Sequence, residues 1–363
     1  MMYLISALTI IINLIFSKNK YVSIASGVFL WIGMAFNDVI VDRTQYRRMY
    51  ANPLKFNEEW GYTYLQLLAR KFGLSFQVFF AILIGACLAV AILTIIRNTT
   101  NPGFVLALYF IFPYLMDAAQ VRSFLAGCII TAIVPLLLNF SLKNVFSYIV
   151  GIFIAGLFHY SAYFYLLFLI TYFLSWKVIV PLFAIIAFVL MSNIIPLLKI
   201  IAKIIPLLST KIDRYLKPEL FTASNEMWAY TIYLIALILL TVVTYLILRN
   251  YDYATREQTK KRSISRKPNQ TNFSDLMLKL DGILLLILPL ISVSVSYDRV
   301  IRMMLLTHYI YFSKVFSLKI SFSAKTIYFM LLLIFVVYYL WFFIYTRFPA
   351  AVFWPFFQGN SIF

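Results

Sequence analysis

The stretch at residues 76–96 reads FQVFFAILIGACLAVAILTII and contains no charged side chain. A helix rising 1.5 Å per residue needs roughly 20 such residues to cross the hydrocarbon core of a bilayer. The whole chain shares this character, because 63% of its 363 residues are hydrophobic, 12% are charged and the mean hydropathy is +0.90. Ordinary soluble domains carry about 25% charged residues. The sequence therefore predicts a polytopic membrane protein.

The alternation over about ten residues that is typical of membrane β-barrels does not recur, so the predicted class is all-α. Orientation follows from residues 249–280, where Lys and Arg lie among Ser, Thr, Asn and Gln. By the positive-inside rule this segment is a basic cytoplasmic loop. Counting from it predicts about 12 transmembrane helices (about 10 to 14) in a single integral membrane domain, with both termini outside.

The expected helices lie near residues 3–17, 19–37, 76–96, 103–118, 123–140, 145–158, 161–176, 178–192, 228–248, 281–297, 303–318 and 326–345. Basic residues that play no part in setting the orientation also fall inside: Lys18, Lys20, Arg97, Lys143, Lys177, Lys319 and Lys325. The two larger extracytoplasmic segments are then 37–75 and 193–227. An amphipathic pattern over 194–208 predicts an interfacial helix in the second.

Three arginines on the outer side run against the positive-inside bias: Arg122, Arg299 and Arg302. Arg122 is expected at the start of a helix, where a guanidinium and unpaired backbone N–H groups favour a phosphate. Arg299 and Arg302 are spaced i, i+3, so in a helix they share a face and can clamp a pyrophosphate. Alternatively, Arg122 reaches the lipid headgroups or pairs with Asp117, and Asp298 neutralises one of the other two.

The first outer segment combines carboxylates with aromatic rings. Asp42, Tyr46 and Tyr50 recur at i, i+4 and i+8, one face of a helix, and Glu59 and Tyr62 follow. A sugar-binding cleft uses carboxylates to bind hydroxyls and rings to stack on pyranoses. Tyrosine also anchors membrane proteins at headgroup level, which is the alternative reading.

A histidine is expected at an outer turn. His159 can act there as a general base or as a donor to a phosphate, or it can be a structural residue bonded to a backbone carbonyl. On this topology six polar residues meet at the outer face: Asp42, Glu59, Arg122, His159, Arg299 and Arg302. No nucleotide-binding glycine loop, zinc-binding helix or nucleophile elbow is present in the sequence, so we expect no metal and no cofactor.

The motifs follow one another as Asp42-x3-Tyr46-x3-Tyr50, Glu59-x-Gly61-Tyr62, Gln120-Val-Arg122-x3-Ala126, Phe158-His159-x-Ser161-Ala162, Lys211-x3-Tyr215 and Arg299-x2-Arg302. In this order and spacing they resemble the EpsG-like branch of the Wzy polysaccharide polymerases, over about residues 35–305. The arginine motif departs from the family, which more often has Arg-Gln, and the basic loop is longer than the family's.

This resemblance implies a metal-independent glycosyltransferase of polysaccharide biosynthesis, such as an O-antigen, capsule or exopolysaccharide polymerase. Such an enzyme joins repeat units carried on undecaprenyl pyrophosphate at the outer face of the bacterial cytoplasmic membrane. A chain-length regulator and a flippase of the same pathway are the expected protein partners, and nucleic acid is not expected. The implied site residues are Arg122, His159, Asp42 and Glu59 for catalysis, Arg122, Arg299 and Arg302 for pyrophosphate, and Tyr46, Tyr50, Tyr62 and Tyr215 for sugar.

Two other functions would use the same outer arginines. A flippase or transporter of lipid-linked glycan should place charges along a path through the bilayer, whereas most predicted helix centres contain none. A multi-spanning acyltransferase that modifies a surface polysaccharide would centre on a histidine with a carboxylate or arginine on the donor side. His159 is expected to face outward, which favours the polymerase.

Overall fold

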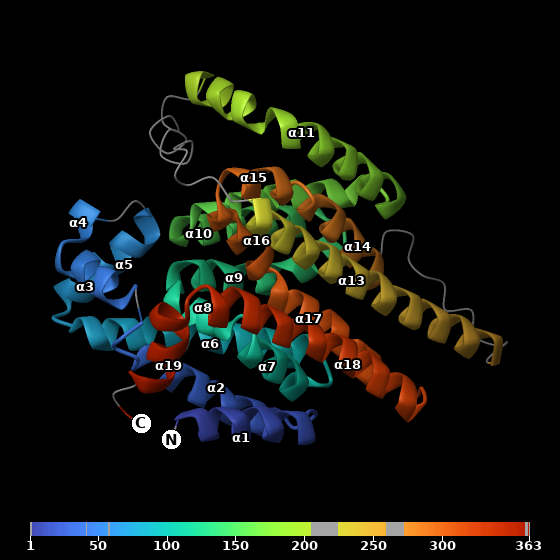
Figure 1. The fold of residues 1–363 in the computed structure, drawn as a ribbon, viewed down its shortest axis with the longest axis horizontal. Helices are drawn as coiled ribbons and strands as arrows, with labels where there is room; N and C mark the ends of the chain where they lie inside the picture. The colour runs from blue at the N-terminus through green and yellow to red at the C-terminus, as the bar shows by residue number, and fades with distance from the viewer. Residues whose placement is uncertain are drawn as a thin grey trace. The chain divides into compact units, whose positions relative to one another are not determined.

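The computed structural model describes residues 2–40, 42–56, 59–204, 224–258, 272–359 and 362. Regular structure in these ranges is helical throughout, which confirms the expected all-α class (Figure 1). The chain divides into two compact units. Unit 1 comprises Met1–Leu136, Phe146–Tyr163 and Met303–Phe363, and unit 2 comprises Leu137–Val145 and Phe164–Arg302.

The chain is a multi-pass membrane protein. Within the described residues, six segments are long and apolar enough to span a bilayer: Phe76–Asn98, Val121–Leu138, Trp176–Ile204, Glu226–Tyr253, Phe273–Val293 and Phe322–Thr346. Shorter apolar helices are Met2–Ile15, Lys20–Ala35, Pro102–Ile111, Leu142–Phe158 and Tyr160–Tyr172. The expected count of about 12 crossings is therefore not confirmed, because several predicted spans are short or divided.

Unit 1 is built on packed helices of the N-terminal half, with α2 against α6 and α7, α1 against α7, and α6 against α9 (Figure 1). Its helices are α1 (Met2–Ile15), α2 (Lys20–Ala35), α3 (Arg43–Ala51), α4 (Pro53–Phe56), α5 (Trp60–Lys71), α6 (Phe76–Asn98), α7 (Pro102–Ile111), α8 (Tyr114–Ala119), α9 (Val121–Ile133) with η1 (Val134–Leu138), most of α10 (Leu142–Phe158), α17 (Leu305–Ser313), η5 (Lys314–Ser317), α18 (Phe322–Tyr339), η6 (Leu340–Thr346), η7 (Pro349–Phe353) and α19 (Trp354–Gln358). The segment 37–75 is thus a set of short helices.

One predicted span in unit 1 is wrong. Residues 103–118 were expected as one helix, but α7 ends at Ile111 and α8 begins at Tyr114. Phe112 has extended backbone, with φ −158° and ψ 132°. The following Pro113 favours that conformation, because a proline ring clashes with a helical residue before it.

Unit 2 packs α11 and α13 against α14 and α15. Its elements are most of η2 (Tyr160–Tyr172), α11 (Trp176–Ile204), α13 (Ser224–Gln258), α14 (Phe273–Leu284), α15 (Ile287–Val293), η4 (Val295–Tyr297) and α16 (Asp298–Met303). The predicted span at 161–176 is therefore a 3-10 helix, and the predicted span at 281–297 is divided between α14, α15 and η4.

Two predicted segment boundaries in unit 2 differ from the structure. Helix α11 runs without a break through residue 193, although Pro181 and Pro196 lie inside it, so no separate helix begins at 194. Apolar surroundings tolerate prolines within long helices, because neighbouring groups satisfy the freed carbonyls. Helix α13 continues to Gln258 and α14 begins at Phe273, so helix enters both ends of the predicted loop 249–280. The predicted helix end at 208 lies outside the described residues.

Candidate functional site

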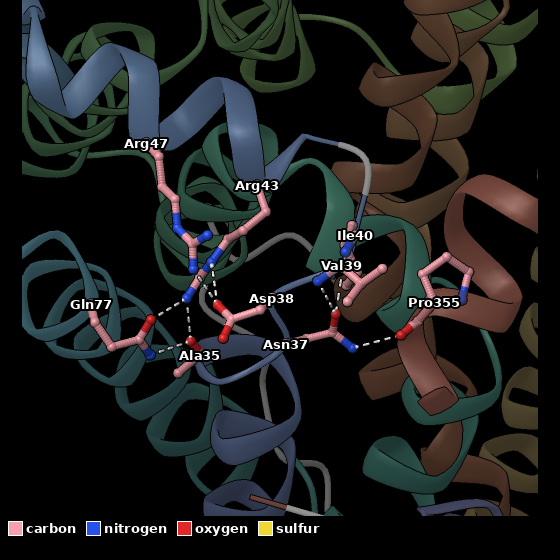
Figure 2. A network of polar contacts seen from close by, with 9 residues as sticks. All are labelled: Ala35, Asn37, Asp38, Val39, Ile40, Arg43, Arg47, Gln77 and Pro355. Atoms are coloured by element: carbon pink, nitrogen blue, oxygen red, sulfur yellow. Dashed lines mark hydrogen bonds and ion pairs between the residues drawn. The ribbon is translucent and has the colours of Figure 1, made fainter. Parts of the chain in front are cut away.

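Helix α3 is held in place by its first residue, Arg43. Its side chain is buried, and Nη2 donates to the main-chain oxygen of Ala35 at 2.6 Å and to Oε1 of Gln77 at 2.7 Å (Figure 2). The guanidinium carbon lies 3.9 Å from the ring centroid of Phe80. Ala35 is the last residue of α2, where the helix dipole favours a cation. Burial lowers the pKa of Arg43 to about 10, so the side chain is charged at neutral pH.

The turn before α3 is fixed by two further side chains. Asp38 accepts from Nη2 of Arg47 at 2.6 Å and lies 3.8 Å from Nε of Arg43. Asn37 accepts from the backbone N–H groups of Val39 and Ile40, each at 3.2 Å, and donates to the main-chain oxygens of Pro355 and Phe356 at 3.2 and 2.8 Å (Figure 2). The connection from α2 to α3 is therefore bonded on one side to α6 and on the other to α19.

Tyr46 and Tyr50 of α3 and Tyr62 of α5 face the interior of unit 1. Tyr46 lies 6.0 Å from Tyr62 and 5.8 Å from Phe80, measured between ring centroids. Tyr50 stacks on Phe79 at 5.2 Å, and its hydroxyl donates to the main-chain oxygen of Leu74 at 2.5 Å. These rings pack on other aromatic rings. Their predicted contact with sugar stays a prediction, and no open stacking face supports it.

The centre of the site is an ion pair between Glu59, the residue before α5, and Arg122, the second residue of α9. Nη1 of Arg122 donates to Oε2 of Glu59, across 63 positions of sequence. Glu59 is 7% exposed, and Arg122 is mostly buried. The Arg122 guanidinium carbon lies 6.0 Å from the Tyr46 ring centroid. Its Nε is buried and makes no hydrogen bond within the described part of the chain.

Burial keeps the surrounding phenols neutral. It raises the pKa of Tyr62 and of Tyr46, and in both cases the charge of Arg122 opposes the increase without cancelling it. Two hydroxyl groups therefore lie close to the ion pair as neutral groups, which can donate or accept a hydrogen bond.

The expected alternative partner of Arg122 does not hold it. The carboxylate of Asp117 accepts from the hydroxyl of Tyr109 at 3.1 Å. The salt bridge of Arg122 is with Glu59, a pairing that sequence reasoning did not identify. Asp42 occupies the N-cap position of α3, makes no capping bond with its side chain and is half-buried. Its charge raises the pKa of Tyr46, which places it near the same ring.

His159 has a structural contact. It is 9% exposed, and its Nδ1 accepts from the backbone N–H of Ser161 at 3.3 Å. Nδ1 is therefore the acceptor nitrogen of the ring, and the bond caps the start of η2. The structural alternative expected a bond to a backbone carbonyl, whereas the partner of Nδ1 is a backbone N–H, and the catalytic role of His159 stays a prediction.

Arg299 and Arg302 lie in α16 of unit 2, between the expected helices 281–297 and 303–318, so the turn expected there is a short helix. Nε of the buried Arg302 lies 3.5 Å from Oδ2 of Asp298, so the neutralising contact considered from the sequence is present. The hydroxyl of Tyr165 donates to the main-chain oxygen of Val300, between the two arginines. Their approach to Arg122 stays a prediction, and Tyr215 lies outside the described residues.

The comparison with known families decides the identity. The model of the EpsG family matches residues 20–357, which include all of unit 2 and most of unit 1. The chain belongs to the EpsG family. No curated protein and no solved structure matches it. The family confirms the expected resemblance, and it indicates a glycosyltransferase-like polymerase of polysaccharide biosynthesis.

Sequence reasoning missed two residues that position the site of this EpsG-family protein. Arg43 and Gln77 fix α3, which carries Tyr46 toward Arg122. A signal was present, because Arg43 precedes Tyr46 by three positions and so shares its helix face. A basic residue on the buried face of a helix is rarely found unless its charged group is paired or hydrogen-bonded.

Proposed function

We propose that this protein polymerises oligosaccharide repeat units carried on undecaprenyl pyrophosphate, at the outer face of the bacterial cytoplasmic membrane. The EpsG family supports the reaction class. The observation that carries the proposal is the mostly buried pair of Glu59 and Arg122, which places a carboxylate beside a guanidinium. A departing pyrophosphate and an acceptor hydroxyl need these two kinds of group.

In the proposed reaction, the acceptor oxygen forms a bond to the anomeric carbon of the donor sugar. The bond from that carbon to the pyrophosphate oxygen breaks, and the hydroxyl proton moves to a carboxylate. His159, whose Nδ1 accepts from Ser161, is proposed to donate to the departing phosphate through Nε2. Arg122 stabilises the charge that develops on the pyrophosphate, an effect that is strong where protein and lipid exclude water. Backbone N–H groups at the start of α9 add to it.

The carboxylates have different contacts and therefore different proposed roles. Glu59 is engaged by Arg122, so we assign it to orienting the guanidinium and the acceptor. Asp42 is half-buried and acts electrostatically on Tyr46, and we assign it to accepting the proton. Arg299 and Arg302 are proposed to bind pyrophosphate as well. Their role depends on an approach of α16 to the lipid-linked substrate.

A flippase for the same lipid is the second candidate. Helix α14 carries two buried charged residues, Lys279 and Asp281, within the segment Phe273–Val293, which is long and apolar enough to span a bilayer. Charges inside a span are typical of a transport path. Lys279 nevertheless donates to the main-chain oxygen of Thr171 at 2.7 Å, a contact that joins α14 to the end of η2 and explains its burial. This contact favours the polymerase.

The test uses purified protein in nanodiscs with lipid-linked repeat units and neither nucleotide nor acyl donor. A polymerase yields a ladder of longer glycans, whereas a flippase or acyltransferase leaves the glycans at their original length. Arg122→Lys is expected to lower the rate at least tenfold, because an ammonium cannot make the forked contact of a guanidinium. Wild-type activity in Arg122→Lys and Arg122→Ala proteins of normal folding would exclude the assigned role.

A further inference from the structure

Over its first nine residues, helix α5 has an exposed face of large apolar and aromatic side chains and a buried face that includes polar ones. Its exposed face carries Trp60, Tyr64, Leu67 and Leu68, and Trp60 and Tyr64 are 74% and 65% exposed. On a helix these positions follow the i, i+4, i+7 and i+8 pattern of one stripe. In water this face would be unfavourable, since each exposed large apolar side chain forgoes its burial energy.

The opposite face is buried although it is polar. Tyr62, Thr63 and Gln66 face the interior of unit 1, and Gln66 is 0% exposed. Gly61 marks the line of contact, because a Cβ there would lie 2.6 Å from Cβ of Leu157 on α10. Since α5 packs this closely through Gly61, the rotation of the helix is set and the apolar stripe must face outward.

The length of α5 and the charges at its end indicate which apolar medium covers the stripe. With 12 residues, α5 is about 18 Å long, so it is too short to cross a core of roughly 30 Å. Arg70 and Lys71 are exposed in its last turn. A short helix with an apolar face, exposed tyrosine and tryptophan, and basic residues at one end is typical of the boundary between lipid headgroups and acyl chains.

We propose that α5 is an interfacial helix whose stripe (Trp60, Tyr64, Leu67 and Leu68) lies in the lipid bilayer, so that the segment 37–75 is not an outer loop in water. Arg70 and Lys71 then lie among phosphate headgroups. The route by which the substrate reaches the site is a further step, which rests on the proposed function. Glu59 directly precedes Trp60, so its pair with Arg122 lies at headgroup depth, and the pyrophosphate of a lipid-linked substrate enters sideways from the bilayer.

The test measures the depth of α5 with spin labels in nanodiscs. Single cysteines replace Tyr64 or Leu67 in full-length protein whose Cys87 and Cys128 are changed to Ala. Ile82→Cys, on the exposed side of α6, serves as the lipid reference, and Asn139→Cys, in the turn between η1 and α10, as the water reference. Collision with oxygen and with a nickel chelate distinguishes acyl chains from water.

Labels at Tyr64 and Leu67 are expected to collide with oxygen as the label at Ile82 does, and to be protected from the nickel chelate at least threefold relative to Asn139. Equal access of the chelate at all three sites would overturn the proposal. The fluorescence of Trp60 gives a second measurement that needs no cysteine. Brominated lipid should quench the tryptophan fluorescence of wild type more than that of the Trp60→Phe protein. Neither measurement needs polymer synthesis, so a membrane-embedded α5 in a protein that makes no polymer would refute only the proposed function.

Discussion

At the scale of single residues, most of the site depends on Glu59 and Arg122, which form a buried ion pair. Glu59→Gln removes the countercharge and leaves a buried guanidinium, a change expected to lower the free energy of unfolding by about 3 kcal/mol. The double variant Glu59→Gln with Arg122→Gln should recover much of this loss, because neither charge is then unpaired. Thermal unfolding in one detergent measures both. A double variant as unstable as the sum of the singles would contradict the ion pair.

Arg43 and Arg47 provide a matched comparison on the same helix. Arg43 is buried with two hydrogen bonds, whereas Arg47 is about half exposed and bonds Asp38. Arg43→Lys is expected to cost about 2 kcal/mol of unfolding free energy, and Arg47→Lys under about 1 kcal/mol. Polymerisation should also fall more with Arg43→Lys, since α3 positions Tyr46. Equal effects of the two changes on stability and rate would show that the network does not fix α3.

At the scale of elements, α16 depends on η2. Tyr165 donates to the main-chain oxygen of Val300, and both residues are buried. Tyr165→Phe is expected to lower the unfolding free energy by about 1 to 2 kcal/mol and to lower the polymerisation rate through Arg299 and Arg302. Tyr114→Phe is the control, because its hydroxyl makes an equivalent bond to the main-chain oxygen of Leu30 at 2.7 Å.

The two tyrosine variants should be equally stable and differ in rate. Addition of Arg299→Lys and Arg302→Lys tests the route of the effect. If Tyr165 acts through the arginines, Tyr165→Phe lowers the rate little further on that background. The same additional loss on both backgrounds would assign Tyr165 to the stability of unit 2 alone.

The success of sequence reasoning also varies by element. Local spacing predicted α3 and the start of α9 near Arg122, because residues three and four apart share a helix face. Helix α16 was not predicted, because it lies between the expected helices 281–297 and 303–318. Contacts distant in sequence left no such pattern, so Glu59 was not assigned to Arg122. Helices α11 and α13 are also longer than the helices expected at 178–192 and 228–248. The prolines within α11 and the charged residues near the end of α13 do not end these helices, because neighbouring helices support them.

At the scale of the whole molecule, the stability at alkaline pH depends on the tyrosines that are buried in the interior, such as Tyr62. Burial raises the pKa of Tyr62 above its ordinary value of 10.0 in the folded state. Its contribution to stability is therefore complete below pH 10.0 and is lost as the pH rises toward the folded-state pKa, since the unfolded chain ionises first. The thermal midpoint of wild type should fall as the pH rises above 10.0. The midpoint of the Tyr62→Phe protein should fall less over the same range. A parallel decline of the two proteins would contradict this assignment.

The bonds from Asn37 to the carbonyls of Pro355 and Phe356 connect the beginning of the site to residues more than 300 positions later. During synthesis the turn before α3 therefore emerges long before its partner does. The bonds of Arg43 to Ala35 and Gln77 join parts of the chain that are made early, whereas the bonds of Asn37 to α19 form only after the C-terminal helix is made. Deletion of residues 355–358 should leave a chain that inserts into the membrane but holds α3 loosely.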